Sequence, residues 1–484
     1  MATNQPFLSL NNDTGPEGTD GANYYFPADD KLSSDKEIYP DELSDEAGEG
    51  HGHAKDGAKA SVFGSAMNIA NTIMGAGILA LPNVIKQFGV LLGSAIITFS
   101  CILTFVSCTL LLKSKNLSKH SKYISIGKHC FGNAGLWIVK LIIIVNNIGL
   151  CIAYLIIFTT VSTNLVQGFA KECQPGGSGD AIYCNSWALT LLASVMVTPF
   201  VFAKSMAKLQ GASTIAVLAA AIFSIVTVEN FLAEVVDGTN PTDINILPHI
   251  DKIPTALASV TSVFLAFTFQ FNFFPVYKTL QDPSDQRMKH TTSLGLTIVL
   301  IIYLSVANCG YLTFGKDSKA GFLDNFTKDN LGLVKFIIVN VAFLISSTLT
   351  FPLMFFGAKN ETYGAIKLIR KAFDKKKVEF DATRFEDDEK TIEEKYGFKG
   401  AQFHIYTFVL FAIIVVLAIK VPGIDSVFSF VGSTAANGLN FLLPAMFYLK
   451  LASKKGKMRA IALVMCIVGA VMGVVGIVSS ALTH

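Results

Sequence analysis

The chain has 484 residues, of which 51% are hydrophobic and only 15% are charged. Soluble proteins carry about a quarter charged residues, so this composition excludes an ordinary soluble enzyme. The formal net charge of +3 hides a split, because residues 1–60 hold 13 acidic and 4 basic residues. The basic excess of the remaining chain gives no reason to expect a nucleic-acid partner, since Lys and Arg on short membrane loops usually report orientation.

Residues 1–60 form an acidic N-terminal tail that is rich in Asp, Glu, Gly, Ser and Asn and has no hydrophobic period. Such a segment cannot bury enough apolar surface to offset the entropy of ordering, so we predict that it is disordered. It lacks a basic stretch followed by an apolar one, so we do not expect a cleaved signal peptide. A trafficking or regulatory role of the tail, and its partners, stay open.

The rest of the chain, 61–484, is predicted to be a transmembrane domain. It contains eleven charge-free stretches of 20 to 30 residues, and each can cross a hydrocarbon core of ~30 Å as a helix. The sequence therefore predicts an all-α polytopic membrane protein in contact with the lipid bilayer. Its eleven predicted helices are 61–85, 87–112, about 136–169, 186–203, 209–231, 254–277, 291–313, 333–358, 402–420, 425–449 and 460–482.

Basic residues lie unevenly among the predicted loops. If the tail is cytosolic, the five loops on its side hold 26 Lys and Arg, and the opposite loops hold far fewer. This bias predicts a cytosolic N-terminus and, with an odd number of spans, a C-terminus on the other side. The long cytosolic loop 359–401 opens with YGAIKLIRKAF, whose apolar residues gather on one helical face. That pattern fits a helix on the membrane surface or a solvated linker helix equally well.

Two features of the opposite loops agree with this orientation. Cys173 and Cys184 lie in one non-cytosolic loop, where an oxidising compartment permits a disulfide, although both could be free thiols. Asn325-Phe326-Thr327 is an N-glycosylation sequon on the same side. The sequons that begin at Asn116 and Asn360 fall on the cytosolic side and are expected to stay unmodified.

The first span reads SAMNIANTIMGAGILALP, with Gly75 and Gly77 inside the apolar run. Glycine costs ~1 kcal/mol relative to alanine in a helix interior, so two so close together predict a break. Unwound backbone at membrane depth must line a cavity, bind a ligand or find buried partners. The start of the resumed half-helix would suit a carboxylate. The alternative is that Gly-Ala-Gly is a close-packing surface between helices.

The sixth span is also interrupted by polar residues, at Thr268, Gln270 and Asn272, and Pro275 follows them. Because proline removes a backbone donor, a second broken helix is expected. Breaks in spans one and six are typical of two inverted five-helix repeats, here about 61–233 and 254–449, with an extra helix at 460–482.

The eighth span carries hydroxyl side chains: Ser346, Ser347, Thr348 and Thr350. Such hydroxyls commonly bond back to a carbonyl one turn earlier. The alternative is a sodium site made of hydroxyl and carbonyl oxygens. The sequence contains no metal cluster, nucleophile–base pair or phosphate-binding loop, so we expect neither enzymatic activity nor a cofactor, with sodium as a candidate coupling ion only.

Several strings resemble a known family: MNIANTIMGAGILALP, IGLCIAYLIIF, LAFTFQFNFFPVY, GYLTFG, LTFPL and FVGSTAANGLNFLLPAMFYLK. They are similar to the amino acid/auxin permease family, and within it to sodium-coupled neutral amino acid transporters of systems A and N and fungal vacuolar amino acid transporters. The resemblance covers roughly residues 60–483. It implies the fold of bacterial leucine transporters, with helices one to five and six to ten as inverted repeats plus one extra helix.

The resemblance also implies a site. The broken first helix would bind the backbone groups of an amino acid, chiefly through main-chain atoms. The implied substrate residues, from helices one, three and six, are Met74, Gly75, Ala76, Gly77, Tyr154, Phe267, Thr268, Phe269 and Gln270. The implied sodium site uses the side chains of Asn71 and Thr350, to which carbonyls of Met74, Ser346 or Ser347 could add. Many relatives have a titratable His where this chain has Gln270, so a proton-sensing role of that His does not carry over.

These features predict a secondary transporter that moves neutral amino acids by alternating access, driven by a sodium or proton gradient. The membrane is the plasma membrane or a vacuolar or lysosomal one. The alternative is a transporter-fold sensor that binds an amino acid and signals through its cytosolic segments. An ion channel would show rings of charge or a filter-like segment, and neither appears.

Overall fold

A computed structural model describes residues 59–173, 181–202, 210–238, 243–248, 250, 252–373, 401–453 and 456–483. The predicted disorder of the tail, 1–60, falls almost wholly outside these residues, as does most of the predicted loop 359–401. Within the described part, every regular element is a helix, and one isolated bridge pairs Ala60 with Leu280.

The helices are α1 (Val62–Ile73), η2 (Ala76–Ala80), α2 (Leu81–Ser118), α3 (Tyr123–Phe169), η3 (Lys171–Cys173), η4 (Ile182–Cys184), α4 (Ser186–Val201), α5 (Gln210–Asp237), α6 (Ile253–Ala266), η6 (Gln270–Asn272), α7 (Phe273–Thr279), α8 (Asp285–Phe314), η7 (Gly315–Asp317), η8 (Phe322–Asn325), α9 (Lys328–Phe373), α11 (Ala401–Lys420), α12 (Ile424–Val431), η9 (Gly432–Ala436), η10 (Gly438–Leu442), α13 (Leu443–Leu451) and α14 (Lys457–Thr483). Among the described residues, eight helical stretches are long and apolar enough to cross a membrane, and α4 is a shorter apolar helix. A multi-pass membrane protein is therefore confirmed.

The first two predicted spans meet at a chain reversal inside α2. Gly89 has a φ of 77°, and a Cβ on Gly93 would lie 3.0 Å from the Cα of Ile85. A straight helix would separate those two residues by about 12 Å, so the chain doubles back between them. The charge pattern predicts the boundary at Lys86, but the chain reverses beyond it, near Gly89. Lys86 itself lies within the helix, and its ammonium donates to the carbonyl of Ser318 (2.6 Å).

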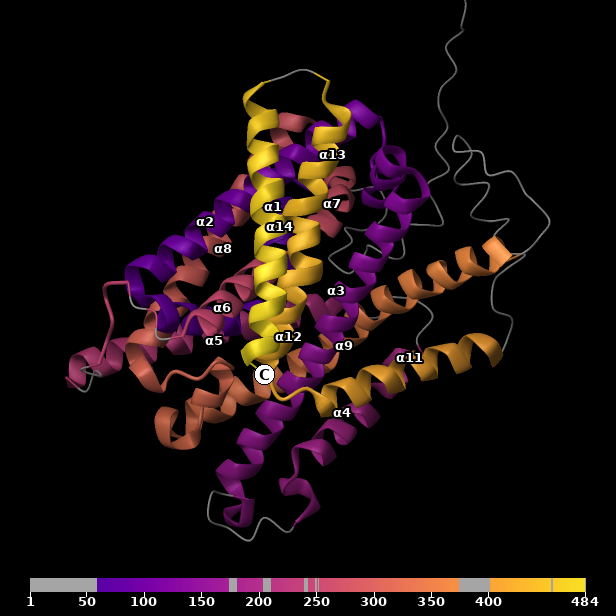
Figure 1. Ribbon diagram of the computed structural model, residues 1–484. Helices are drawn as coiled ribbons and strands as arrows, with labels where there is room; N and C mark the ends of the chain where they lie inside the picture. Colours follow the sequence, from indigo (N-terminus) through magenta and orange to yellow (C-terminus); the bar gives the residue numbers. More distant parts are fainter. Residues whose placement is uncertain are drawn as a thin grey trace, which may run out of the picture. The chain divides into compact units, whose positions relative to one another are not determined.

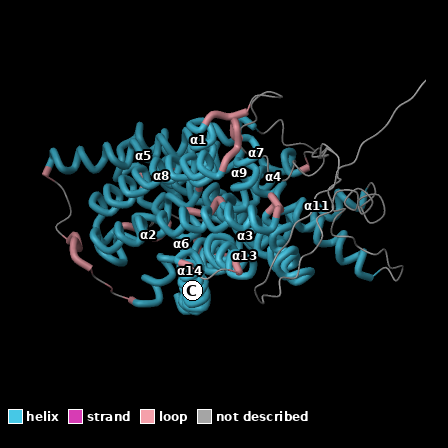
Figure 2. The backbone as a smooth tube through the Cα atoms, turned by 90° about the horizontal axis from the view of Figure 1, so that it is seen from above, coloured by secondary structure: helices cyan, strands magenta, loops and turns pink. Residues whose placement is uncertain are grey.

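Helices far apart in sequence lie side by side in the bundle. α3 packs along α9, and α8 packs against α1, α2 and α5 (Figure 1). Figure 2 shows α6 beside α2 and α14. The stretch that holds α6 and α7 is the most buried of the eight apolar stretches, and the one in α14 is the least. The broken sixth helix is therefore central.

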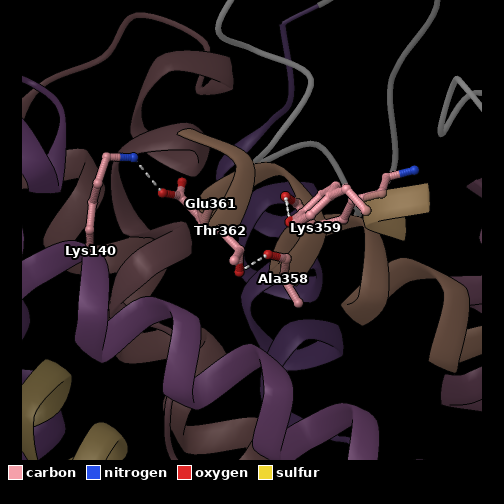
Figure 3. A network of polar contacts seen from close by, with 6 residues as sticks. Lys140, Ala358, Lys359, Glu361 and Thr362 are labelled. Carbon is pink, nitrogen blue, oxygen red and sulfur yellow. Dashed lines mark hydrogen bonds and ion pairs between the residues drawn. The ribbon is translucent and has the colours of Figure 1, made fainter. Parts of the chain in front are cut away.

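The segment YGAIKLIRKAF is the end of α9 and not a separate helix, because α9 is helical from beyond Gly332 to Phe373. The predicted loop 359–401 thus begins as helix. Polar contacts stabilise this end: the Lys140 ammonium lies 2.9 Å from the Glu361 carboxylate, and the Thr362 hydroxyl donates to the carbonyl of Ala358 (2.7 Å) (Figure 3). The Tyr406 hydroxyl donates to the carbonyl of Lys359 (2.8 Å).

We expect Glu361→Gln to destabilise the protein, because it leaves the largely buried Lys140 ammonium without its anion. Both side chains are less than a fifth exposed, at 14% and 18%. The cost should be about 1–3 kcal/mol, between the values for surface and buried pairs. Thermal unfolding in detergent measures it. The matched control is Asp243→Asn, which breaks the exposed pair with Lys316 and should change stability by less than about 0.5 kcal/mol. Equal effects of both substitutions would contradict the expectation.

Candidate functional site

The predicted break in the first helix is present. α1 ends at Ile73, and Met74 (φ −71°, ψ 77°) and Gly75 (φ −125°, ψ −144°) leave the helical conformation before η2 begins. The N–H of Gly75 turns back to the carbonyl of Ile73 (2.8 Å), as in an inverse γ-turn. Ala76 and Gly77 open the resumed helix, where N–H groups have no acceptor in a preceding turn. The break thus places backbone donors at membrane depth, and the N–H of Ala76 interacts with the Tyr154 hydroxyl.

The sixth helix is also broken, between Ala266 and η6. The N–H of Thr268 donates to the carbonyl of Leu265 (3.0 Å), so the carbonyl of Phe264 loses its usual helical partner. That carbonyl accepts instead from the Thr268 hydroxyl (2.8 Å) and from Nδ2 of Asn440 in η10 (2.7 Å). Because a buried carbonyl without a donor is costly, Asn440 stabilises this glycine-free break.

The two breaks face each other. A Cβ on Gly77 would lie 2.6 Å from the Cα of Ala266, so the two backbones are in close contact. Nδ2 of Asn272 in η6 donates to the Thr72 hydroxyl (3.2 Å) in the last turn of α1. A Cβ on Gly75, by contrast, would meet only the Tyr154 hydroxyl, at 3.0 Å. The close-packing interpretation therefore applies to Gly77, and Gly75 faces a side chain of α3.

A cavity lies at the break of α1. Its volume is about 10 Å³, room for about one water molecule. None of its lining residues is charged, and they come from the α1 break, α3, α5 and α9: Met74, Gly75, Ala76, Tyr154, Ile157, Ala220, Phe343, Ser346 and Ser347. An amino acid would require this lining to move apart.

The structure brings some of the predicted substrate residues to this cavity and not others. Met74, Gly75, Ala76 and Tyr154 line it. Gly77 and the four residues of the sixth-helix break do not, although that break is buried. The Gln270 side chain folds back on its own segment, since Oε1 accepts from the N–H of Phe269 (2.9 Å).

Three lining residues were not predicted: Ile157, Ala220 and Phe343. An apolar residue in a membrane helix has the same sequence signal whether it faces lipid, another helix or a cavity. Phe343 packs edge-on against Phe223 of α5, with ring centroids 5.3 Å apart. Only the packing of α3 and α5 against α9 identifies this wall.

The hydroxyls of the eighth predicted span behave in two ways. Those of Ser347 and Thr348 donate to the carbonyl of Leu344, at 3.1 and 2.7 Å, as back-bonded hydroxyls do. The Thr350 hydroxyl is buried and has no hydrogen-bond partner in the described part of the chain. A buried orphan oxygen of this kind fits a ligand of a cation, so back-bonding accounts for two of these hydroxyls and leaves Thr350 unexplained.

A second cavity, of about 590 Å³, opens at the end of the bundle that carries the Cys173–Cys184 disulfide. That disulfide was predicted and is confirmed. The second cavity is lined by polar and charged side chains that include Asn164, Lys319 and Asp324, and it shares Ile157 with the first. We call it the vestibule.

The sequon residue Asn325 lies in η8 beside the vestibule. It is 3% exposed, Oδ1 accepts from the N–H of Lys319 (2.8 Å), and Nδ2 donates to the carbonyl of Asp317 (3.0 Å). Glycosylation of Asn325 stays a prediction, and this burial means that the glycan would have to be transferred before the loop folds.

We expect Asp324→Asn to stabilise the protein at neutral pH. Burial raises the pKa of the Asp324 carboxyl, Lys319 lowers it and Asp425 raises it. A raised folded-state pKa means that stability is greatest below the ordinary value of 3.8 and is lost as pH rises through the folded value. The gain of the amide variant in melting temperature should therefore shrink on acidification. A gain that is the same at acidic and neutral pH would contradict this.

Known proteins of similar sequence indicate a family for this chain. A family profile described as "Transmembrane amino acid transporter protein" matches residues 58–483. Amino acid transporter AVT6E of Arabidopsis thaliana is 27% identical over 443 residues, which cover 88% of this chain and 85% of that protein. Sodium-coupled neutral amino acid symporter 2 of Danio rerio is 27% identical over 416 residues, 81% of this chain and 75% of that protein.

Two solved structures share the fold. MhsT in complex with L-phenylalanine has a TM-score of 0.53 at 12% identity, covering 87% of this chain and 99% of that one. The inward-facing conformation of Mhp1 has a TM-score of 0.50 at 12% identity, covering 88% and 90%. At such identity the likeness concerns the fold alone. The family resemblance and the absence of enzymatic activity are confirmed by the family match and the relatives. The chain belongs to the transmembrane amino acid transporter family.

Proposed function

We propose that the protein is a secondary transporter that carries neutral amino acids across its membrane by alternating access. The observation that carries this proposal is the uncharged cavity at the break of α1. A carboxylate would accept from the N–H groups that open η2, at the positive end of the resumed helix. The substrate's amino group would donate to oxygens of Ser346 and Ser347 or of the α1 end.

The substrate side chain would meet the apolar wall of Ile157, Ala220 and Phe343. Because none of the lining residues is charged, a charged side chain would lose its hydration without gaining an ion partner. This supports neutral amino acids as the substrate class. The vestibule would serve as the entry path on its side of the membrane.

We propose sodium as the coupling ion, with protons as the alternative. The Thr350 hydroxyl is one of the buried oxygens that have no hydrogen-bond partner in the described structure. Asn71 lies in the last turn of α1, and Met74 and Ser346 contribute to the lining of the cavity. Unwound carbonyls and hydroxyls of this kind coordinate sodium in broken-helix transporters. The likeness to a relative named a sodium-coupled symporter supports the same choice.

We further propose that all eleven predicted helices cross the membrane, in two inverted five-helix repeats plus α14. Three of them are short or interrupted and are therefore not among the eight long apolar stretches. α1 is broken at Met74, α4 has 16 residues, and the helix from α12 to α13 is interrupted by the π-helical η9 and η10. The breaks at α1 and α6 fall in the first helix of each proposed repeat, which supports the internal symmetry.

The test is uptake of a panel of labelled amino acids into proteoliposomes, with sodium and proton gradients imposed separately. Accumulation of neutral amino acids above the equilibrium level is the expected result. The alternative, a sensor that signals through its cytosolic segments, would bind an amino acid without accumulating it. Binding with no flux under either gradient would contradict the transporter proposal.

A further inference from the structure

One side chain outside the cavity contacts both broken helices. Tyr303, in the middle of α8, is fully buried. Its hydroxyl donates to the carbonyl of Ile73 at the end of α1 (2.8 Å) and lies 3.0 Å from the carbonyl of Ala266 at the end of α6. Its ring packs edge-on against Phe267, with centroids 5.2 Å apart. Tyr303 therefore joins the two breaks through their backbones.

Both carbonyls lose their usual helical partner at the breaks, although that of Ile73 also accepts from the N–H of Gly75 (2.8 Å). In unbroken helices, the carbonyls of Ile73 and Ala266 would accept from the N–H groups four residues later. A buried carbonyl without a donor costs free energy, and a hydroxyl has a single proton to share. Tyr303 can serve both carbonyls only while the ends of α1 and α6 lie close together. Its hydroxyl thus favours this arrangement over any in which the two ends separate.

The surrounding contacts describe a contracted site. Gly77 lies directly against Ala266, Asn272 donates to Thr72, and the cavity beside them holds about 10 Å³. An amino acid must therefore push the lining apart. The Tyr303 hydroxyl would lose one of its acceptors if this expansion separated the two breaks.

We propose that Tyr303 is a positioning residue whose hydroxyl ties the broken ends of α1 and α6 together in this closely packed arrangement, so that it opposes substrate binding and assists the return of the unloaded carrier. This inference rests on the proposed transport function. When a ligand binds only a minor conformation, its apparent affinity is the intrinsic affinity multiplied by the fraction of molecules in that conformation. Loosening the tie removes part of that penalty.

The test compares Tyr303→Phe with wild type in binding, net uptake and exchange. We expect the variant to bind the amino acid about 5-fold or more tightly, since one lost buried hydrogen bond shifts a two-state equilibrium by that order. Net uptake should fall, because the empty carrier must pass through the contracted site. Exchange of internal for external amino acid should persist, because it uses only the loaded carrier. A merely structural defect would not tighten binding.

The matched control is Tyr311→Phe, on the same helix. Tyr311 is equally buried, but its hydroxyl accepts from the N–H of Asn245 in a loop away from the breaks. It should leave the ratio of net uptake to exchange unchanged. If Tyr303→Phe does not fold, Asn272→Ala loosens the tie between α1 and η6 and should shift binding and that ratio in the same direction.

Unchanged or weaker binding by a folded Tyr303→Phe, an equal fall in net uptake and exchange, or the same effects in Tyr311→Phe would overturn the inference. Wild-type protein tested in parallel separates this from the transport proposal. If wild type shows no flux at all, the proposed function fails. If wild type transports and Tyr303→Phe behaves like it, only the role of Tyr303 fails.

Discussion

Gly75→Val should abolish amino acid uptake while the protein still folds. A Cβ at this position would lie 3.0 Å from the Tyr154 hydroxyl. The two methyl groups of the valine would enter a cavity of about 10 Å³. They would occupy the space beside the N–H groups that we assign to the substrate carboxylate. A misplacement of 1 Å can cost on the order of 100-fold in rate, so we expect uptake to fall at least about 100-fold. Initial uptake into proteoliposomes, normalised to folded protein, measures it.

Two other glycines of the same region provide controls. A Cβ on the exposed Gly64 of α1 would meet only the Ser61 hydroxyl, at 3.4 Å, so Gly64→Val should transport normally. A Cβ on Gly77 would collide with the backbone of Ala266, so Gly77→Val should impair folding itself. Normal uptake by a well-folded Gly75→Val would contradict the site at the break.

The positions of both breaks could be predicted because their causes are local. Gly75 and Gly77 weaken the first helix by their own conformational freedom, and the structure interrupts that helix at Met74 and Gly75. The polar residues of the sixth span likewise mark where α6 ends. What stabilises each break could not be predicted. Asn440 and Tyr303 lie far away in the chain, and a sequence contains no signal for which carbonyl such a side chain will meet.

Only the part of the candidate site that has a local cause could be predicted from the sequence. Its backbone component follows from the broken first helix, but its apolar wall follows from which faces of α3, α5 and α9 meet. Gln270 illustrates the limit of such reasoning: its assignment to the substrate stays a prediction, and in the structure its amide oxygen accepts from the backbone next to it. Intramembrane polarity predicts that a group needs a partner and does not say which one.

Thr350→Val should remove sodium activation while leaving expression and folding intact. Valine keeps the branched shape of threonine and discards the oxygen, so packing around this buried position is preserved. Losing one ligand of a desolvated ion should cost about 1–3 kcal/mol, or roughly 5- to 150-fold in apparent sodium affinity. Asn71→Ala should weaken sodium activation in the same way. Sodium dependence of uptake, and the sodium-induced shift in melting temperature, measure both effects.

The control for Thr350→Val lies two residues away. Thr348 already donates its hydroxyl to the carbonyl of Leu344, so Thr348→Val should leave sodium activation unchanged. Uptake that is driven by a pH gradient, indifferent to sodium and unharmed by Thr350→Val would exclude the sodium assignment and leave the transporter proposal intact.

The orphan hydroxyl of Thr350 makes the sodium-free protein informative as well. Because this oxygen is buried with no partner in the described structure, removing it relieves a desolvation penalty. Thr350→Val should therefore be as stable as wild type, or more stable, without sodium, and less stabilised than wild type when sodium is added. An ion that binds the folded state stabilises it more as its concentration rises above the dissociation constant. The melting temperature of wild type should therefore rise with sodium more steeply than that of Thr350→Val and overtake it. A purely structural role for this hydroxyl predicts instead that the variant is less stable at every sodium concentration.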